Sequence, residues 1–138
     1  MITLYLARHG QTIENASGIF QGQTPGTLSE SGKAQAATLC EPLSKLHFDA
    51  VYCSDLQRCK DTAAIALQRT SYTPIYTPLL RERDMGNLVG KPVAGALIDD
   101  SVESAEQCAV RARRLLQMLK AQHDGQTVLL ISHGYFCR

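Results

Sequence analysis

The stretch ITLYLARHGQT, residues 2–12, decides the fold class of this chain. Residues 2–7 are apolar or favour β-structure at successive positions, a pattern typical of a central strand in a parallel sheet. The apolar run stops abruptly at Arg8, His9 and Gly10. Because the buried strand ends in a cation, an imidazole and a glycine, these groups are expected to lie where the strands of the sheet end.

Helices alternate with further apolar strands along the rest of the chain. Ser29 is suited to cap a helix, and Ser54 with Gln57 and Ser104 with Gln107 have the spacing of capping boxes. This alternation predicts an α/β fold with a mainly parallel sheet. We predict strands over 50–53, 73–80 and 127–134, helices over 30–46, 55–68 and 104–122, and loops over 13–28 and 81–103.

The length predicts a single domain over residues 1–138, since domains commonly contain ~100–150 residues. A net charge of +1 provides no overall field for nucleic acid or an anionic membrane, so neither is expected as a partner. No apolar run approaches the ~20 residues needed to span a bilayer, and no signal peptide is recognisable. Five cysteines without C-x-x-C spacing predict free thiols in a reducing cytoplasm.

Polar side chains follow each predicted strand. In parallel sheets, ligands bind beyond the carboxyl ends of the strands, so these side chains should meet at one edge. A single histidine or arginine at such a position is usually solvated, but four polar clusters at matching strand ends favour a functional site. The clusters are Arg8-His9-Gly10, Ser54 with Arg58, Arg81-Glu82-Arg83, and Ser132-His133-Gly134.

These residue types suit phosphoryl transfer through histidine. The guanidinium group of arginine can donate two parallel hydrogen bonds to the oxygens of a phosphate. A neutral imidazole can act as a nucleophile. A second histidine can donate to oxygens on which charge develops, and a carboxyl group can protonate the departing alkoxide. No pair of histidines has metal-ligand spacing and no acidic cluster is near, so neither a metal nor another cofactor is expected.

Four motifs resemble the signatures of the histidine phosphatase superfamily, also called the phosphoglycerate-mutase-like family. They are LARHGQT (6–12), YCSDLQRCKDTA (52–63), LRERDMGNLVG (80–90) and LLISHG (129–134), with QG (21–22) and LSESGKAQA (28–36) as further similarities. The resemblance covers residues 2–137 and is closest to the small phosphatases of the family. It implies a three-layer α/β/α sandwich.

The resemblance also implies roles for individual residues. His9 matches the nucleophile that becomes phosphohistidine, and Gly10 would let the backbone turn close to the phosphate. The other matches are Arg8 and Arg58 as the phosphate clamp, His133 as the second pocket histidine, Glu82 as the proton donor, and Asn15 and Gln21 as residues of the pocket wall.

The chain departs from the family pattern in two places. It is short between Gly90 and Glu103, where relatives often carry an insertion, and it stops at Arg138, before the helix and strand that usually follow. We therefore expect either an oligomer that covers the flank beside the strand at 127–132 or a marginally stable fragment of a longer protein.

The predicted function is hydrolysis of a small phosphorylated metabolite. Two alternatives are mutase-type phosphoryl transfer, which needs a more enclosed site, and a non-catalytic phosphate-binding module, which would need no proton donor. A cysteine-dependent phosphatase built on Cys53 and Arg58 is disfavoured, because four residues separate the two instead of the usual five. The loops 13–28 and 84–103 carry the substrate determinants, and the substrate itself is not identified.

Overall fold

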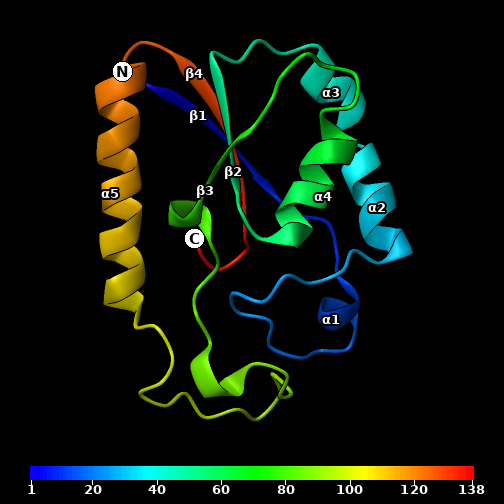
Figure 1. Ribbon diagram of the computed structural model, residues 1–138, viewed down its shortest axis with the longest axis vertical. Helices are drawn as coiled ribbons and strands as arrows, with labels where there is room; N and C mark the ends of the chain where they lie inside the picture. Colours follow the sequence, from blue (N-terminus) through cyan, green and yellow to red (C-terminus); the bar gives the residue numbers. More distant parts are fainter.

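A four-stranded sheet with every strand parallel lies at the centre of the molecule (Figure 1). The computed structural model describes residues 1–138. The strand order is β1-β4-β2-β3, so the last strand of the sequence lies between the first and the second. The predicted parallel sheet is therefore confirmed. The strands are β1 (Thr3–Arg8), β2 (Ala50–Ser54), β3 (Ile75–Thr77) and β4 (Thr127–Ser132).

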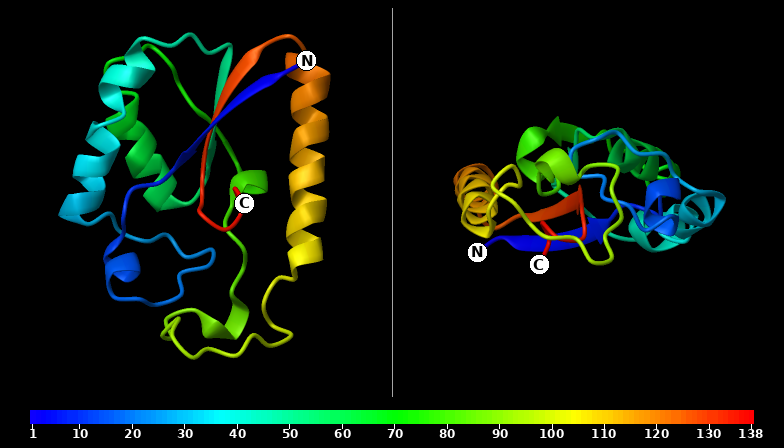
Figure 2. Two further views of the ribbon diagram at one scale, coloured as in Figure 1. Left: turned by 180° about the vertical axis from the view of Figure 1, so that it is seen from behind. Right: turned by 90° about the horizontal axis from the view of Figure 1, so that it is seen from below.

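Helices cover both faces of the sheet and confirm the three-layer α/β/α sandwich. The long α5 lies on one face, and α3 and α4 lie on the other, with α2 packed against α4 (Figure 2). No helix is both long and apolar enough to cross a membrane. The helices are α1 (Ile13–Ala16), α2 (Glu30–Ala37), α3 (Cys40–Ser44), α4 (Gln57–Ala66) and α5 (Ala105–His123), with two 3₁₀ turns at Pro78–Leu80 and Gly86–Leu88.

The position of β4 in the sheet explains why its sequence is continuously apolar. Val128 and Leu130 pack with residues of α5, whereas Leu129 and Ile131 pack with residues of α3 and α4. All four side chains are at most 3% exposed. A strand covered on both faces gains hydrophobic stabilisation at every position, about 1.5–3 kcal/mol for each large side chain.

Strand β1 does not have the central position that its apolar pattern predicts. It pairs only with β4 and forms an edge of the sheet. Tyr5 and Leu6 are 41% and 56% exposed as a result. The expected open flank beside the strand at 127–132 is also wrong, because β4 is paired on both sides and the open edges run along β1 and β3. An apolar pattern reports the tendency to be buried but carries no information about the order of strands.

The predicted helix over 30–46 is two helices. Helix α2 ends at Ala37 and α3 begins at Cys40. Pro42 accounts for the break, because proline has no N–H and its ring would clash with the carbonyl four residues earlier in a continuous helix. The predicted strand over 73–80 is reduced to β3, which lies between Pro74 and Pro78.

Local capping differs from the sequence prediction in two places. Residues 13–28 contain the short helix α1, which begins with a capping box between Thr12 and Asn15. The expected capping box of Ser54 and Gln57 is absent, and α4 begins after Leu56 without a side-chain cap. The box of Ser104 and Gln107 at the start of α5 is confirmed.

Two glycines allow α2 to approach the backbone that follows His9. A Cβ atom on Gly10 would lie 2.3 Å from the carbonyl oxygen of Gly32, and a Cβ atom on Gly32 would lie 1.9 Å from the carbonyl oxygen of Gln11. Both distances are far below van der Waals contact. The structure thus gives Gly10 a packing role against α2, a different role from the expected approach to a phosphate.

We expect Gly32→Ala to destabilise the protein by about 1–3 kcal/mol, because the new methyl group must displace backbone atoms. Urea unfolding at neutral pH measures this loss. Ser31→Ala, at the exposed neighbouring position of the same helical turn, is the control and should change the stability little. A Gly32→Ala protein as stable as the parent would show that the approach of α2 is not tight.

Candidate active site

The polar residues that follow the four strands lie together at the end of the sheet where the carboxyl ends of the strands meet. His9 and His133 follow β1 and β4, and the centroids of their rings are 5.2 Å apart. Arg58 lies in the first turn of α4, and Glu82 follows the 3₁₀ turn after β3. A cavity of about 250 Å³ opens here and is lined by His9, Arg58 and Glu82 together with Arg8.

His9 is held in one orientation by its own loop. Its Nδ1 atom lies 2.6 Å from the carbonyl oxygen of Gly10, which can only accept, so Nδ1 carries the proton and Nε2 keeps a lone pair. Burial lowers the pKa of His9 to about 4, with the charges of Arg58 and Arg8 acting in the same direction and the bond to Gly10 opposing them. The ring is therefore neutral at physiological pH.

His133 is completely buried behind His9. Its Nε2 atom lies 2.8 Å from the Ser54 hydroxyl oxygen and 3.4 Å from the Cys59 sulfur. Burial lowers the pKa of His133 to about 2, assisted by the charge of Arg58. The ring does not line the cavity and meets His9 edge to face, with an interplanar angle of 63°.

The two arginines of the predicted phosphate clamp have different surroundings. Arg58 is 1% exposed, and its terminal nitrogens donate to the carbonyl oxygens of Thr24 at 2.5 Å and Gly22 at 2.7 Å. Its Nε atom is buried without a partner. Arg8 is exposed and lies against Gly134, where a Cβ atom would come within 3.0 Å of its guanidinium carbon. Arg58 thus fixes the loop at 22–24. Arg8, at the end of β1, lines the cavity.

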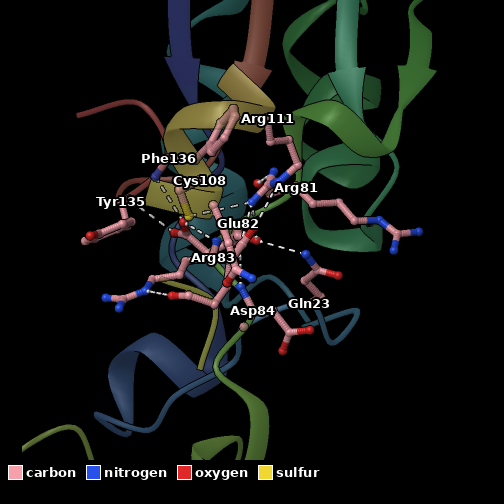
Figure 3. Close-up of polar contacts among 12 residues, drawn as sticks. Gln23, Arg81, Glu82, Arg83, Asp84, Cys108, Arg111, Tyr135 and Phe136 are labelled. Atoms are coloured by element: carbon pink, nitrogen blue, oxygen red, sulfur yellow. Dashed lines mark hydrogen bonds and ion pairs between the residues drawn. The ribbon is translucent and has the colours of Figure 1, made fainter. Parts of the chain in front are cut away.

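Glu82 is bound by backbone N–H groups from two segments (Figure 3). Its Oε1 atom accepts from Arg83 at 2.9 Å and from Phe136 at 3.0 Å. Its Oε2 atom accepts from Tyr135 at 3.1 Å. The turn after His133 therefore fixes the carboxylate at the wall of the cavity, in a position where Oε2 still has a free lone pair.

Asn15 and Gln21 also line the cavity, as predicted from their positions in the loop. The Oδ1 atom of Asn15 accepts from the Thr12 N–H at 3.1 Å, so its capping role leaves the amide nitrogen for other partners. Gln21 is 7% exposed, and its Oε1 atom is buried without a partner.

The model of the histidine phosphatase superfamily (branch 1) matches residues 4–138 of this chain. The chain belongs to the histidine phosphatase superfamily.

Similar proteins and structures of this superfamily extend beyond the matched region. A probable phosphatase of Schizosaccharomyces pombe is 43% identical over 67% of this chain and 45% of its own length. The metal-independent phosphoserine phosphatase of Arabidopsis thaliana is 36% identical over 95% of this chain and 63% of its own length. A mycobacterial glucosyl-3-phosphoglycerate phosphatase, solved in complex with VO3, is 30% identical over 96% of this chain and 76% of its own, with a TM-score of 0.86. The chain thus spans about half to two thirds of the length of these two curated relatives.

The cavity also has an apolar wall that the motifs do not reveal. Backbone hydrogen bonds join Phe20 to Lys91 and to Gly90, so the loops at 19–20 and 90–93 lie side by side. Both regions expected to carry substrate determinants contribute to this wall. Its apolar members are Ile19, Phe20, Met85, Val93, Ile98 and Tyr135.

Cys53 lies outside the cavity. Cys53 is fully buried in the core between the sheet and α4, and its thiol donates to the carbonyl oxygen of Ser54. It does not line the cavity, so the structure gives no support to a cysteine nucleophile paired with Arg58. No group of three or more His, Cys, Asp or Glu side chains is arranged to hold a metal ion.

The stability of the protein should fall as the pH drops below about 6.5. In the unfolded chain His9 and His133 protonate near 6.5, whereas in the folded protein their pKa values are about 4 and about 2. The unfolded state therefore binds more protons between these values, and each histidine removes about 2 kcal/mol of stability between pH 7 and pH 5.

Urea unfolding at the two pH values, with the imidazole titrations followed by NMR, tests this expectation. His9→Gln should lose part of the pH dependence. His47→Gln, at an exposed histidine, is the control and should retain all of it. An imidazole of His9 that titrates near 6.5 would contradict the assignment of a neutral buried ring.

Proposed function

We propose that this chain is a phosphomonoesterase that hydrolyses a small phosphorylated metabolite through a phosphohistidine at His9. The observation that carries the proposal is the orientation of the His9 ring. The bond from Nδ1 to Gly10 leaves the lone pair of Nε2 available, and the ring lies at the cavity beside Arg8 and Arg58. The phosphatase names of the relatives support the same reaction.

The first chemical step transfers the phosphoryl group to the enzyme. Nε2 of His9 forms a bond to phosphorus while the bond between phosphorus and the ester oxygen breaks. The departing alkoxide takes a proton from Glu82, whose Oε2 atom has room for that proton beside its single hydrogen bond. The products of this step are the free alcohol, phosphohistidine and the Glu82 carboxylate.

The second step releases phosphate. The Glu82 carboxylate accepts a proton from a water molecule as the water oxygen forms a bond to phosphorus. The bond from phosphorus to Nε2 breaks, and the neutral imidazole of His9 is restored. Glu82 is protonated again, so the cycle is balanced without a metal ion.

The cationic side of the cavity would hold the phosphoryl oxygens during both steps. Arg8 and Arg58 are the charged donors that line the cavity. Asn15 and Gln21 add amide groups at the same wall. His133 would act from behind, by holding the ring of His9 through the edge-to-face contact.

Hydrolysis fits this cavity better than mutase-type transfer. A mutase must exclude water while its phosphorylated intermediate persists. Val93 and Ile98 at the wall of the cavity are 49% and 55% exposed, so the loop at 93–98 does not close over the site. Water therefore has access to the intermediate.

His9→Ala should abolish turnover, because no other group at the cavity can form the covalent intermediate. Enzyme mixed with ³²P-labelled substrate and quenched in base, in which phosphohistidine survives, should carry label when His9 is present and none in the variant. His47→Ala is the matched control and should be labelled normally. Substantial activity in His9→Ala, or a wild-type protein that binds phosphate without labelling, would favour a binding module.

Glu82→Gln should slow the hydrolysis of alkyl phosphates by about 10²–10⁴-fold, because the alkoxide then leaves without a proton. Aryl phosphates, whose phenolate leaves unassisted, should be affected far less. Steady-state rates on glycerol 3-phosphate and 4-nitrophenyl phosphate measure the difference. Equal losses on both esters would exclude Glu82 as the proton donor.

A further inference from the structure

Arg111 of α5 binds the main chain on which Glu82 is carried (Figure 3). One terminal nitrogen donates to the carbonyl oxygen of Arg81 at 2.6 Å and to that of Leu79 at 3.3 Å. The other donates to the carbonyl oxygen of Glu82 at 3.3 Å. The Arg111 side chain is only 16% exposed, so these bonds are shielded from water. The guanidinium group therefore fixes the backbone directly before and at Glu82.

The same guanidinium group also reaches the turn that binds the Glu82 carboxylate. Its central carbon lies 4.3 Å from the centroid of the Phe136 ring, a cation–π distance. The N–H of Phe136 donates to Oε1 of Glu82. Arg111 thus contacts the main chain of Glu82 and also Phe136, whose N–H donates to the Glu82 carboxylate.

Glu103 compensates the buried charge of Arg111 and completes the arrangement. Its two carboxylate oxygens accept from Arg111 at 2.8 Å and 3.2 Å, a bidentate pair. Glu103 is 15% exposed, and its Oε1 atom also accepts from the N–H of Asp84, two residues after Glu82. The ion pair of Arg111 and Glu103 consequently binds the main chain before, at and after Glu82.

We infer that Arg111 is a positioning residue for the proton transfer by Glu82, an inference that rests on the proposed function. Arg111 is not in the cavity lining and does not touch substrate. It acts by keeping the Glu82 carboxyl group where the ester oxygen leaves. A displacement of a catalytic group by about 1 Å is enough to lower a rate by about 100-fold.

Arg111→Met tests the inference, since methionine keeps the apolar contact with Phe136 and removes the donors. We expect kcat/KM on glycerol 3-phosphate to fall by about 10- to 100-fold. On 4-nitrophenyl phosphate it should change by less than about 3-fold, because that leaving group needs no proton. Arg114→Met, at an exposed position one turn further along α5, is the matched control and should change neither rate.

The double variant Glu82→Gln with Arg111→Met separates positioning from folding. If Arg111 acts through Glu82, the double variant should hydrolyse the alkyl ester no more slowly than Glu82→Gln alone. Arg111→Lys keeps the charge but lacks the fork, and it should lie between the wild type and Arg111→Met. If Arg111→Met fails to fold, the rates of Arg111→Lys on the two esters provide the comparison instead.

Equal losses on both esters in Arg111→Met and Arg111→Lys would overturn the inference, since they indicate a role only in holding the fold. Additive losses in the double variant would do the same. Failure of the proposed function gives a different result: no label on His9, or no difference between the two esters in Glu82→Gln itself.

Discussion

The register between β1 and β4 is the constraint on which the rest of the site depends. In the parallel pairing Arg8 lies opposite Ser132, and the N–H of His9 donates to the carbonyl oxygen of Ser132 at 3.1 Å. The residues that follow the two strands are therefore neighbours, although 124 positions separate their numbers in the chain. A slip by one residue would turn every side chain of one strand to the other face and separate the two rings.

This register forces two imidazoles into a small buried space beside two guanidinium groups. Protonated rings would repel each other and the arginines, and burial already disfavours the charge. Both rings are consequently neutral, and each has a defined partner, the carbonyl oxygen of Gly10 for His9 and the Ser54 hydroxyl for His133. The cost in stability at low pH and the proposed role of His9 as a neutral nucleophile therefore have the same physical origin.

The sequence predicts the order of elements and the edge of the sheet where the site lies, because apolar runs and capping residues are local signals. It does not predict that β1 is an edge strand, since the order of strands depends on packing of the whole chain. It also does not predict that Arg58 binds carbonyl groups at 22–24 or that Glu82 binds the N–H groups of 135 and 136. Every residue except proline carries these backbone groups, so no residue type signals their use.

Three side chains of the site, His9, Arg58 and Glu82, are thus oriented by main-chain groups. Such contacts depend on the path of a loop and tolerate many changes in its side chains. The apolar wall around Phe20, Val93 and Ile98 belongs to loops that make their own backbone contacts. Substitutions on this wall can alter which group fits the cavity while His9 and Glu82 stay in place. The contacts that orient the polar residues of the site are thus separate from those that shape its apolar wall.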